Sequence, residues 1–416
     1  MNAEYLGRLL AGLAERHQVP GAQLGLHRDG RTVLAETGVE RYGGATPVSP
    51  RSAFPYGSVT KAFTATVVLQ LVAAGDLGLD DPIGTYLPRP TDVDRVVTPR
   101  HLLSHTSGLP CDAEEPGAVR SLTLMHPPGT AFSYSNAGFV LAGALIAEIT
   151  GMTWQDAVET FVLRPLEIEP AFCAGPSRRP VVPGHSVRTR TVPVEPLFPA
   201  ADAPAGALAG SAADLVAFGR AHLDGRLPHS GRLADMRTGG GDGTPYGLAD
   251  GWGLGLARFR AGDTDWFGHD GTTDGTTSHL RFEPRSGVVL ALTTNASCGL
   301  ALWDDLLAAL GDAGLAVGTY PSPRIAAPAV AEVPDCLGDY VNGDVRYSLV
   351  RTADGAVRVD LDDGLLRELT FYEELRFCAE FPDEPPVAGR FVRDPESGEI
   401  GFMQVGGRVA RRKAGV

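Results

Sequence analysis

Within residues 1–318, segments with the alternating pattern of β-strands lie at both ends, and segments with helical periodicity lie between them. Residues 21–39 form two strand-like runs joined by Asp29-Gly30, a pair that favours a tight hairpin turn. Further strands are predicted at residues 254–256, 279–282 and 288–294. Such a chain buries its apolar residues most simply when its terminal strands share one antiparallel sheet with helices packed against it. We therefore expect the α+β class.

The predicted helices of this region have recognisable start and stop signals. Glycine follows the last apolar residue of two of them, at Gly75 and Gly151, and Ser211 is a typical N-cap. Helices are expected near residues 6–13, 58–75, 136–151, 211–218 and 300–310.

The chain changes character after residue 318. Residues 319–334 are rich in proline and alanine, which is the composition of a linker. Beyond them come short alternating runs, with Asp-Gly pairs at 354–355 and 363–364 as hairpin-type turns. The sequence therefore predicts a larger domain at 1–318, a linker at 319–334 and a small antiparallel β-domain at 335–416.

The composition narrows the classes of partner. The 416-residue chain is 43% hydrophobic and 21% charged, as in globular proteins, and its net charge of -14 disfavours nucleic acid and anionic membranes as partners. Residues 1–19 carry charges and lack the apolar core of a signal peptide, so we expect a cytoplasmic protein without membrane association. The five cysteines have no paired spacing, so neither a metal site nor a cofactor is expected.

Lysine occurs only twice in this chain, at Lys61 and Lys413, and every other permanent cation is arginine. Arginine stays protonated in any protein environment, whereas a buried lysine can lose its proton and act as a base. Ser58 precedes Lys61 by three residues at the predicted start of a helix, which places both side chains on one helix face. The helix dipole and the apolar residues that follow both lower the pKa of this lysine. The pair is a candidate for nucleophilic catalysis by serine.

A second polar segment, Tyr134-Ser135-Asn136, precedes the helix predicted at 136–151. A phenol beside a lysine can move protons between a serine and a leaving group. An asparagine amide can hold Lys61 in place and donate a hydrogen bond to a substrate carbonyl. The alternative interpretation is structural: Ser135 or Asn136 caps the helix, and Tyr134 packs in the core.

The third polar segment is Gly268-His269-Asp270-Gly271-Thr272, just before a predicted strand. Its two glycines allow a ligand to approach the backbone closely. The alternative interpretation is a glycine-rich hairpin turn with the histidine on the surface.

Together, Ser-x-x-Lys at 58–61, Tyr-x-Asn at 134–136 and His-x-Gly at 269–271 resemble, in order, the three motifs of the serine β-lactamases and penicillin-binding proteins. The Tyr-x-Asn form is that of the class C β-lactamase-like branch. The resemblance implies a β-lactamase/transpeptidase-like fold, an antiparallel sheet flanked by helices beside a helical region. The C-terminal β-domain resembles the lipocalin-like domain attached to many of these proteins.

Other segments carry the same likeness, which extends over residues 5–315. They are residues 102–109, 128–151 and 206–218. The first contains a Ser104-His105 pair that looks catalytic, but the resemblance implies a mainly structural role for it.

The resemblance also implies a role for each motif residue. Ser58 would be the acylated nucleophile, and Lys61 and Tyr134 would share the duties of general base and general acid. The backbone N–H groups of Ser58 and Thr272 would form the oxyanion hole.

The same resemblance implies that Asn136, His269 and Gly271 contact the substrate. This chain has His269 where β-lactamases of the branch have lysine. Histidine is mostly neutral at pH 7, and Asp270 adds a negative charge, so strong binding of a β-lactam carboxylate is not expected. The histidine form resembles esterases, D-amino-acid peptidases, acyltransferases and the penicillin-binding-protein-type thioesterases that cyclise nonribosomal peptides.

Three functions follow as hypotheses. The first is a cytoplasmic serine acyl-transfer enzyme that forms an acyl-enzyme on Ser58 from a small-molecule or peptidyl ester, thioester or amide, free or carrier-bound. With water as acceptor it is an esterase or peptidase, and with an amine it is a transacylase or peptide cyclase. The second is a β-lactamase, D,D-carboxypeptidase or D-aminopeptidase. The third is a non-catalytic binding protein on the same fold, which the Ser58, Lys61 and Tyr134 set argues against.

Overall fold

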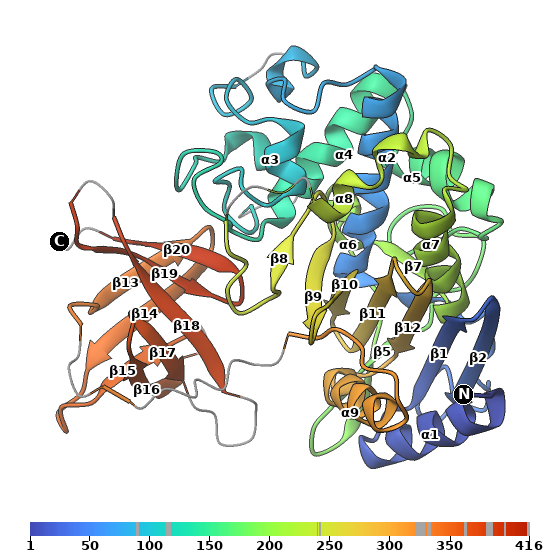
Figure 1. Cartoon of the computed structure of the whole chain (residues 1–416). Coiled ribbons are helices and arrows are strands. Elements are labelled where there is room, and N and C mark those ends of the chain that lie inside the picture. The colour runs from blue at the N-terminus through green and yellow to red at the C-terminus, as the bar shows by residue number, and fades with distance from the viewer. Residues whose placement is uncertain are drawn as a thin grey trace.

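A seven-stranded antiparallel sheet joins the two ends of the larger domain (Figure 1). The N-terminal strand pairs directly with the last strand of this domain, Ala22 opposite Thr294, so the expected sharing of one sheet by the terminal strands is confirmed. The order across the sheet is β2 (Arg31–Gly38), β1 (Gly21–Arg28), β12 (Val288–Thr294), β11 (Thr276–Glu283), β10 (Thr264–Thr273), β9 (Ala257–Ala261) and β8 (Gly251–Trp252).

The computed structural model describes most of the chain. Described are residues 1–88, 91–113, 118–238, 240, 243–320, 329–330, 334–361, 364–379, 386–394 and 397–413. Most of the linker predicted at 319–334 lies outside these residues, so the domain boundaries stay a prediction.

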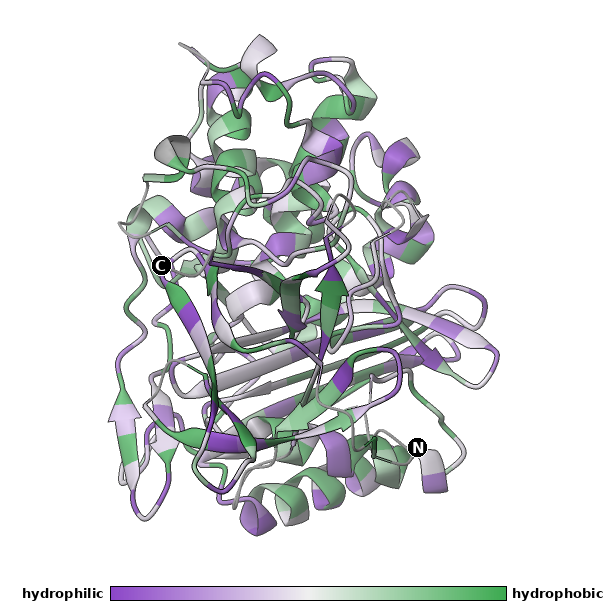
Figure 2. Ribbon diagram, turned by 90° about the vertical axis from the view of Figure 1, so that its left-hand side faces the viewer, coloured by the Kyte–Doolittle hydropathy of each residue, from purple (hydrophilic) through white to green (hydrophobic). Residues whose placement is uncertain are grey.

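Two apolar cores lie on the two faces of the sheet, because successive strand residues point to opposite sides. On β12, Val289 and Ala291 join the core beneath one helical layer, and Leu290 and Leu292 join the core beneath the other. Figure 2 shows the sheet between these layers. The first layer comprises α2 (Thr60–Ala74), α4 (Asn136–Thr150), α5 (Trp154–Val158), α6 (Ala203–Gly206), α7 (Ala212–Asp224) and α8 (Asp235–Thr238), and the second comprises α1 (Ala3–Arg16) and α9 (Gly299–Asp312).

The central helix α2 is buried all round from Thr60 to Leu71. The stretch Gly57–Ala74 is long and apolar enough to span a membrane by composition, but 78% of it is buried within the fold, as in the core helix of a globular domain. The helix ends at the predicted glycine, Gly75, whose φ of 85° closes it in the left-handed conformation.

The helices predicted at 136–151 and 211–218 are also confirmed, with serine caps. Ser135 accepts a hydrogen bond from the backbone N–H of Gly138, and Ser211 forms a capping box with Asp214. The strand predicted at 254–256 is wrong. These residues form the bend between β8 and β9, where Gly255 has a φ of 91° that favours glycine.

The C-terminal region forms a closed eight-stranded antiparallel barrel, in which the last strand pairs with the first. Its interior contains Phe377, Phe391 and Met403. The predicted all-β, lipocalin-like domain is thus confirmed. The strands are β13 (Gly338–Asn342), β14 (Val345–Arg351), β15 (Val357–Asp360), β16 (Leu366–Tyr372), β17 (Arg376–Ala379), β18 (Val387–Arg393), β19 (Ile400–Val405) and β20 (Arg408–Arg412).

Candidate active site

Ser58 lies in a single turn of 3-10 helix (Gly57–Val59) directly before α2. The strand β10 packs against this turn with no room for a side chain between them. A Cβ on Gly271 would lie 2.0 Å from the carbonyl oxygen of Tyr56 and 3.0 Å from the backbone nitrogen of Ser58. Glycine at 271 is therefore required by the close approach of two backbones.

The free edge of β10 faces this turn. The strand pairs with β9 only as far as Gly268, whereas its pairing with β11 continues to Thr273. A Cβ on Gly57 would lie 3.0 Å from the backbone nitrogen of Thr272, so this nitrogen and that of Ser58 lie on adjoining segments. The oxyanion hole that these two N–H groups would form stays a prediction.

Lys61 is completely buried one turn along from the serine. Its Nζ atom lies 3.1 Å from Ser58 Oγ and donates a hydrogen bond of 2.7 Å to the carbonyl oxygen of Ala205 on α6. Burial lowers the pKa of Lys61 to about 7. The amine is therefore partly deprotonated at neutral pH, within reach of the serine proton.

Tyr134 lies against the same amine, with its ring centroid 5.0 Å from Lys61 Nζ. The ring also stacks on His105 at 4.2 Å, so this histidine supports the site through packing. Burial raises the pKa of the phenol, and the neighbouring Ser58 and Arg408 oppose that rise. The Tyr134 hydroxyl forms no hydrogen bond of good geometry within the described part of the chain, although Ser58 is close enough to influence it.

Asn136 does not hold Lys61, contrary to our expectation from the sequence. Its Nδ2 atom donates instead to Asp112 Oδ1 at 2.8 Å. The carbonyl oxygen of Ala205 takes the place expected for the amide, because α6 brings its last turn directly over the lysine. Asn136 and Asp112 are partly exposed and can both reach a substrate.

His269 is 2% exposed, and its ring lies 5.3 Å from Trp252 and 6.3 Å from Tyr134. The structure thus brings the third motif beside the second. Burial lowers the pKa of His269 to about 3, and Lys61 adds to that effect, so the ring is neutral at physiological pH.

Asp270 does not bring a negative charge into the site, which corrects the argument from sequence. The segment from Gly268 to Thr272 is part of β10 rather than a turn before a strand, so Asp270 points to the opposite face from its neighbour. There it forms an ion pair with the buried Arg281 at 2.7 Å and a hydrogen bond with His279 at 2.7 Å. The arginine also donates to the carbonyl oxygen of Gly318.

The barrel contributes a residue that the sequence analysis missed. Arg408, at the start of β20, places its guanidinium carbon 5.1 Å above the Tyr134 ring and donates from Nε to Cys111 Sγ at 3.1 Å. The guanidinium lowers the pKa of the Tyr134 phenol relative to burial alone. A fixed cation therefore lies beside the phenol, supplied by the second domain.

Hydrogen bonds to backbone groups, some of them made by the side-chain amide of Asn342, fix this junction between the domains. The N–H of Tyr134 donates to the carbonyl oxygen of Gly407 at 2.9 Å. The Asn342 amide of β13 accepts from the N–H of Cys111 at 2.6 Å and donates to the carbonyl oxygen of Val409 at 2.9 Å. The second motif is therefore held in part by the barrel.

A groove of about 850 Å³ lies alongside this junction, between the barrel and residues 124–132. Arg390, Arg393 and Arg411 lie in its wall among apolar residues that include Phe402. Within the described residues, none of these three arginines forms an ion pair with a carboxylate. The volume suits a peptide-sized ligand.

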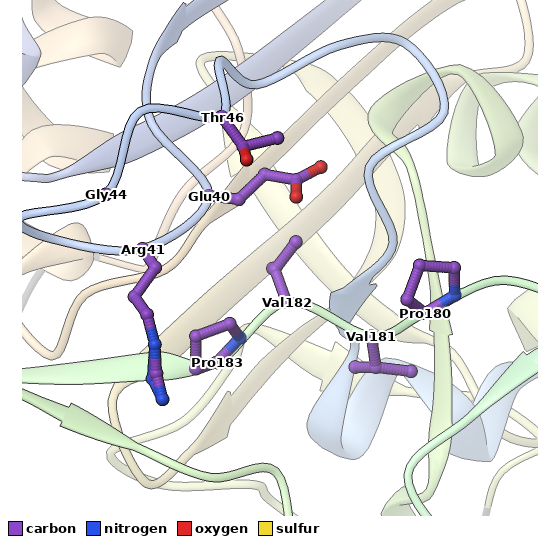
Figure 3. Close-up of a pocket in the computed structure, with 8 residues that line it drawn as sticks. All are labelled: Glu40, Arg41, Gly44, Thr46, Pro180, Val181, Val182 and Pro183. Carbon is purple, nitrogen blue, oxygen red and sulfur yellow. The ribbon is translucent and has the colours of Figure 1, made fainter.

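A smaller pocket, of about 200 Å³, has a different character (Figure 3). Its charged side chains are already engaged, because Glu40 accepts from Ser52 Oγ and Arg41 pairs with Glu195. None of the motif residues lines this pocket or the larger groove. Its lining is Glu40, Arg41, Gly44, Thr46, Pro180, Val181, Val182 and Pro183.

Comparison of the sequence with models of protein families identifies the family of this chain. The beta-lactamase family model matches residues 6–313, a span that holds all three motifs. The chain belongs to the beta-lactamase family. As a member, it is a serine acyl-transfer hydrolase in the general sense, and the role of Ser58 as the nucleophile stays a prediction.

Individual members of the beta-lactamase family and its structural neighbours share different portions of the chain. Penicillin-binding protein 4 of Amycolatopsis lactamdurans is 33% identical over 333 residues, which cover 71% of this chain and 85% of the relative. The crystal structure of SurE is 39% identical, covers 99% of both chains and superposes with a TM-score of 0.89. A D-stereospecific amidohydrolase from Streptomyces sp. is 28% identical, covers 72% of this chain and 95% of its own, and has a TM-score of 0.59.

Proposed function

We propose that the protein transfers a peptidyl group from a thioester or ester to an amine, through an acyl-enzyme on Ser58. The amine can belong to the same peptide, which makes the enzyme a peptide cyclase of the penicillin-binding-protein type. Its place is the cytoplasm, where a carrier protein can present the peptidyl thioester. The observation that carries the proposal is the cluster of the partly exposed Ser58 with the buried Lys61 and Tyr134, which the barrel closes with Arg408.

The geometry accounts for acylation step by step. The neutral amine of Lys61 removes the proton of Ser58 Oγ, which attacks the acyl carbonyl carbon. The backbone N–H groups of Ser58 and Thr272 stabilise the oxyanion. Tyr134 then gives its proton to the departing thiolate or alkoxide as the bond to the acyl carbon breaks, and the Lys61 ammonium returns the serine proton to Tyr134.

Burial of the site favours an amine over water as acceptor. Lys61 is 0%, His269 is 2% and Tyr134 is 4% exposed, so water reaches an acyl group on the partly exposed Ser58 only from the side on which the substrate binds. An amine that is tethered to the acyl group arrives at high effective concentration and needs no diffusion into the site. The groove of about 850 Å³ beside Phe132 offers a surface for the rest of the peptide.

Two charges at the site suit a peptide substrate. Arg408 offers a fixed cation, and the Asp112 carboxylate, held by Asn136, offers an anion to an ammonium group. The relatives support a substrate with a D-configured residue at its acyl end. One structure of SurE, 38% identical over 99% of both chains, contains D-Leu, and another relative is named a D-stereospecific amidohydrolase.

Intact-protein mass spectrometry tests the acyl-enzyme directly. A fluorophosphonate and a p-nitrophenyl ester should each add one adduct to the wild type, and peptide mapping should place it on Ser58. The Ser58→Ala variant is the control and should remain unmodified. An adduct elsewhere, or none, would contradict the serine mechanism.

The acceptor is tested by product analysis. A peptidyl thioester with a D-residue at its acyl end should yield more cyclic than hydrolysed product, whereas the L-epimer should yield little of either. Hydrolysed product alone would reduce the function to a thioesterase.

A second candidate, a penicillin-binding D,D-carboxypeptidase, is favoured by the pairing of Asp270 with Arg281 on the far face of the sheet. This pairing removes the negative charge that disfavours a β-lactam carboxylate. Nitrocefin turnover or a stable penicilloyl adduct on Ser58 would support this candidate, and the absence of both would exclude it.

A further inference from the structure

His269 is fixed in one tautomer by the strand that carries it. Its Nδ1 atom lies 2.6 Å from the backbone carbonyl oxygen of Asp270. A carbonyl oxygen only accepts hydrogen bonds, so Nδ1 carries the proton of the neutral ring and donates it there. The other nitrogen, Nε2, consequently presents a lone pair.

This lone pair is buried and unpartnered within the described residues. The ring that carries it contacts Trp252 and lies near Tyr134 and Lys61, so Nε2 belongs to the catalytic centre rather than to the surface. A buried acceptor without a donor costs free energy unless a bound group satisfies it. The missing partner is therefore a hydrogen-bond donor.

We propose that His269 Nε2 accepts a hydrogen bond from the N–H of the amine that attacks the acyl-enzyme. This inference rests on the proposed transfer to an amine and names the residue that orients the acceptor. It extends the expectation from sequence, in which His269 contacts the substrate without strong binding of a carboxylate. Here His269 of the third motif binds a hydrogen-bond donor of the substrate. Arg408 supplies the fixed cation of the site.

The hydrogen bond directs the amine lone pair at the acyl carbon. The C–N bond forms, and the bond between the acyl carbon and Ser58 Oγ breaks. The proton lost by the amine passes through Tyr134 and Lys61 to Ser58 Oγ, which regenerates the hydroxyl. His269 accepts a hydrogen bond throughout but does not take the proton, so atoms and charges balance without a further reactant.

The ratio of transfer to hydrolysis tests the inference. Both products come from one acyl-enzyme, so their ratio does not depend on the acylation rate. With a p-nitrophenyl ester as donor and D-leucinamide as acceptor, His269→Leu should lower the amide-to-acid ratio about tenfold or more, because a hydrocarbon side chain cannot accept a hydrogen bond. His269→Gln retains an acceptor oxygen and should keep the ratio within about threefold of the wild type.

The outcomes separate this inference from the proposed function. Equal ratios in the wild type and His269→Leu, or equal losses in both variants, would overturn the role of Nε2. A wild type that acylates Ser58 but forms no amide would overturn the inference while leaving the acyl-enzyme intact. Failure of Ser58 acylation would instead contradict the proposed function.

A direct measurement does not depend on activity or on variants. In protein labelled with ¹⁵N-histidine, NMR distinguishes the protonated from the bare ring nitrogen of each neutral histidine. We expect a protonated Nδ1 and a bare Nε2 for His269, assigned by its loss in His269→Gln. The opposite tautomer would overturn the proposal.

Discussion

The guanidinium carbon of Arg408 lies 5.1 Å above the ring of Tyr134, and the two residues belong to different domains. A cation over an aromatic face is attracted to it, and next to a phenol it also favours the deprotonated form. The barrel, through Arg408, therefore lowers the pKa of the Tyr134 phenol relative to burial alone. The catalytic domain alone contains the three motifs but lacks this charge.

Replacement of this arginine should impair chemistry more than folding. Arg408→Gln removes the cation, so the pKa of the Tyr134 phenol should rise, and kcat/KM for a p-nitrophenyl ester should fall about tenfold or more. Arg411→Gln, on the same strand but in the groove wall, is the matched control. Equal activity in both variants would rule out a part for Arg408 in the reaction.

Acylation should depend on pH through Lys61. Its pKa is lowered to about 7, so the neutral base becomes more abundant as pH rises from 5.5 to 8.5, and the acylation rate should rise with a midpoint near pH 7. Lys61→Arg stays protonated over this range and should lose about 100-fold or more in acylation rate. Rapid-mixing measurements of p-nitrophenol release give both results. A flat profile in the wild type would exclude Lys61 as the base.

A methyl group on Gly271 should separate the strand from the nucleophile. Its Cβ would meet the Tyr56 carbonyl oxygen at 2.0 Å, so Gly271→Ala must displace β10 from the turn that carries Ser58. We expect kcat to fall about 100-fold, as when an oxyanion-hole donor is lost. Gly12→Ala, at a helix position with nothing within 4 Å, should leave kcat unchanged. Steady-state kinetics measure kcat for both variants. An unchanged kcat in Gly271→Ala would contradict the need for close contact between β10 and the Ser58 turn.

The ion pair behind the sheet should contribute to stability. Arg281→Met leaves the Asp270 carboxylate without its main partner, and the free energy of unfolding should fall by about 3 kcal/mol. This value is at the low end for a broken buried pair, because part of Asp270 reaches solvent. Arg260→Met breaks an exposed pair on β9 and should cost less than about 1 kcal/mol. Urea titrations compare the two, and equal losses would contradict the importance of burial.

The sequence predicted the local parts of the site well. Ser58 and Lys61 are three residues apart on one helix, so their contact follows from helix geometry alone. The orientation of Asp270 was missed because the motif was placed before a strand, whereas the alternation of a continuous strand sends this side chain to the far face. The expected contact of Asn136 with Lys61 was wrong because the chain path of α6 over Lys61 is a tertiary feature, and the contact of Asn136 with substrate stays a prediction.

Arg408 could not be placed from sequence for a different reason. It follows a linker and seven strands of a separate domain, and only the docking of the barrel brings it to Tyr134. No spacing rule connects positions so far apart. The adjacent glycines at 406 and 407 were the available signal, because a glycine pair before a charged strand residue allows close backbone contact, here with Tyr134.

The order of synthesis gives the barrel a further consequence. Ribosomes add about 5–20 residues per second, so Ser58 leaves the ribosome tens of seconds before Arg408 is made. During part of that interval β1 lacks its sheet partner, because β12 is also synthesised after Ser58. The nascent chain therefore holds Ser58 in an incomplete site, which gains the Arg408 cation only when the barrel has closed.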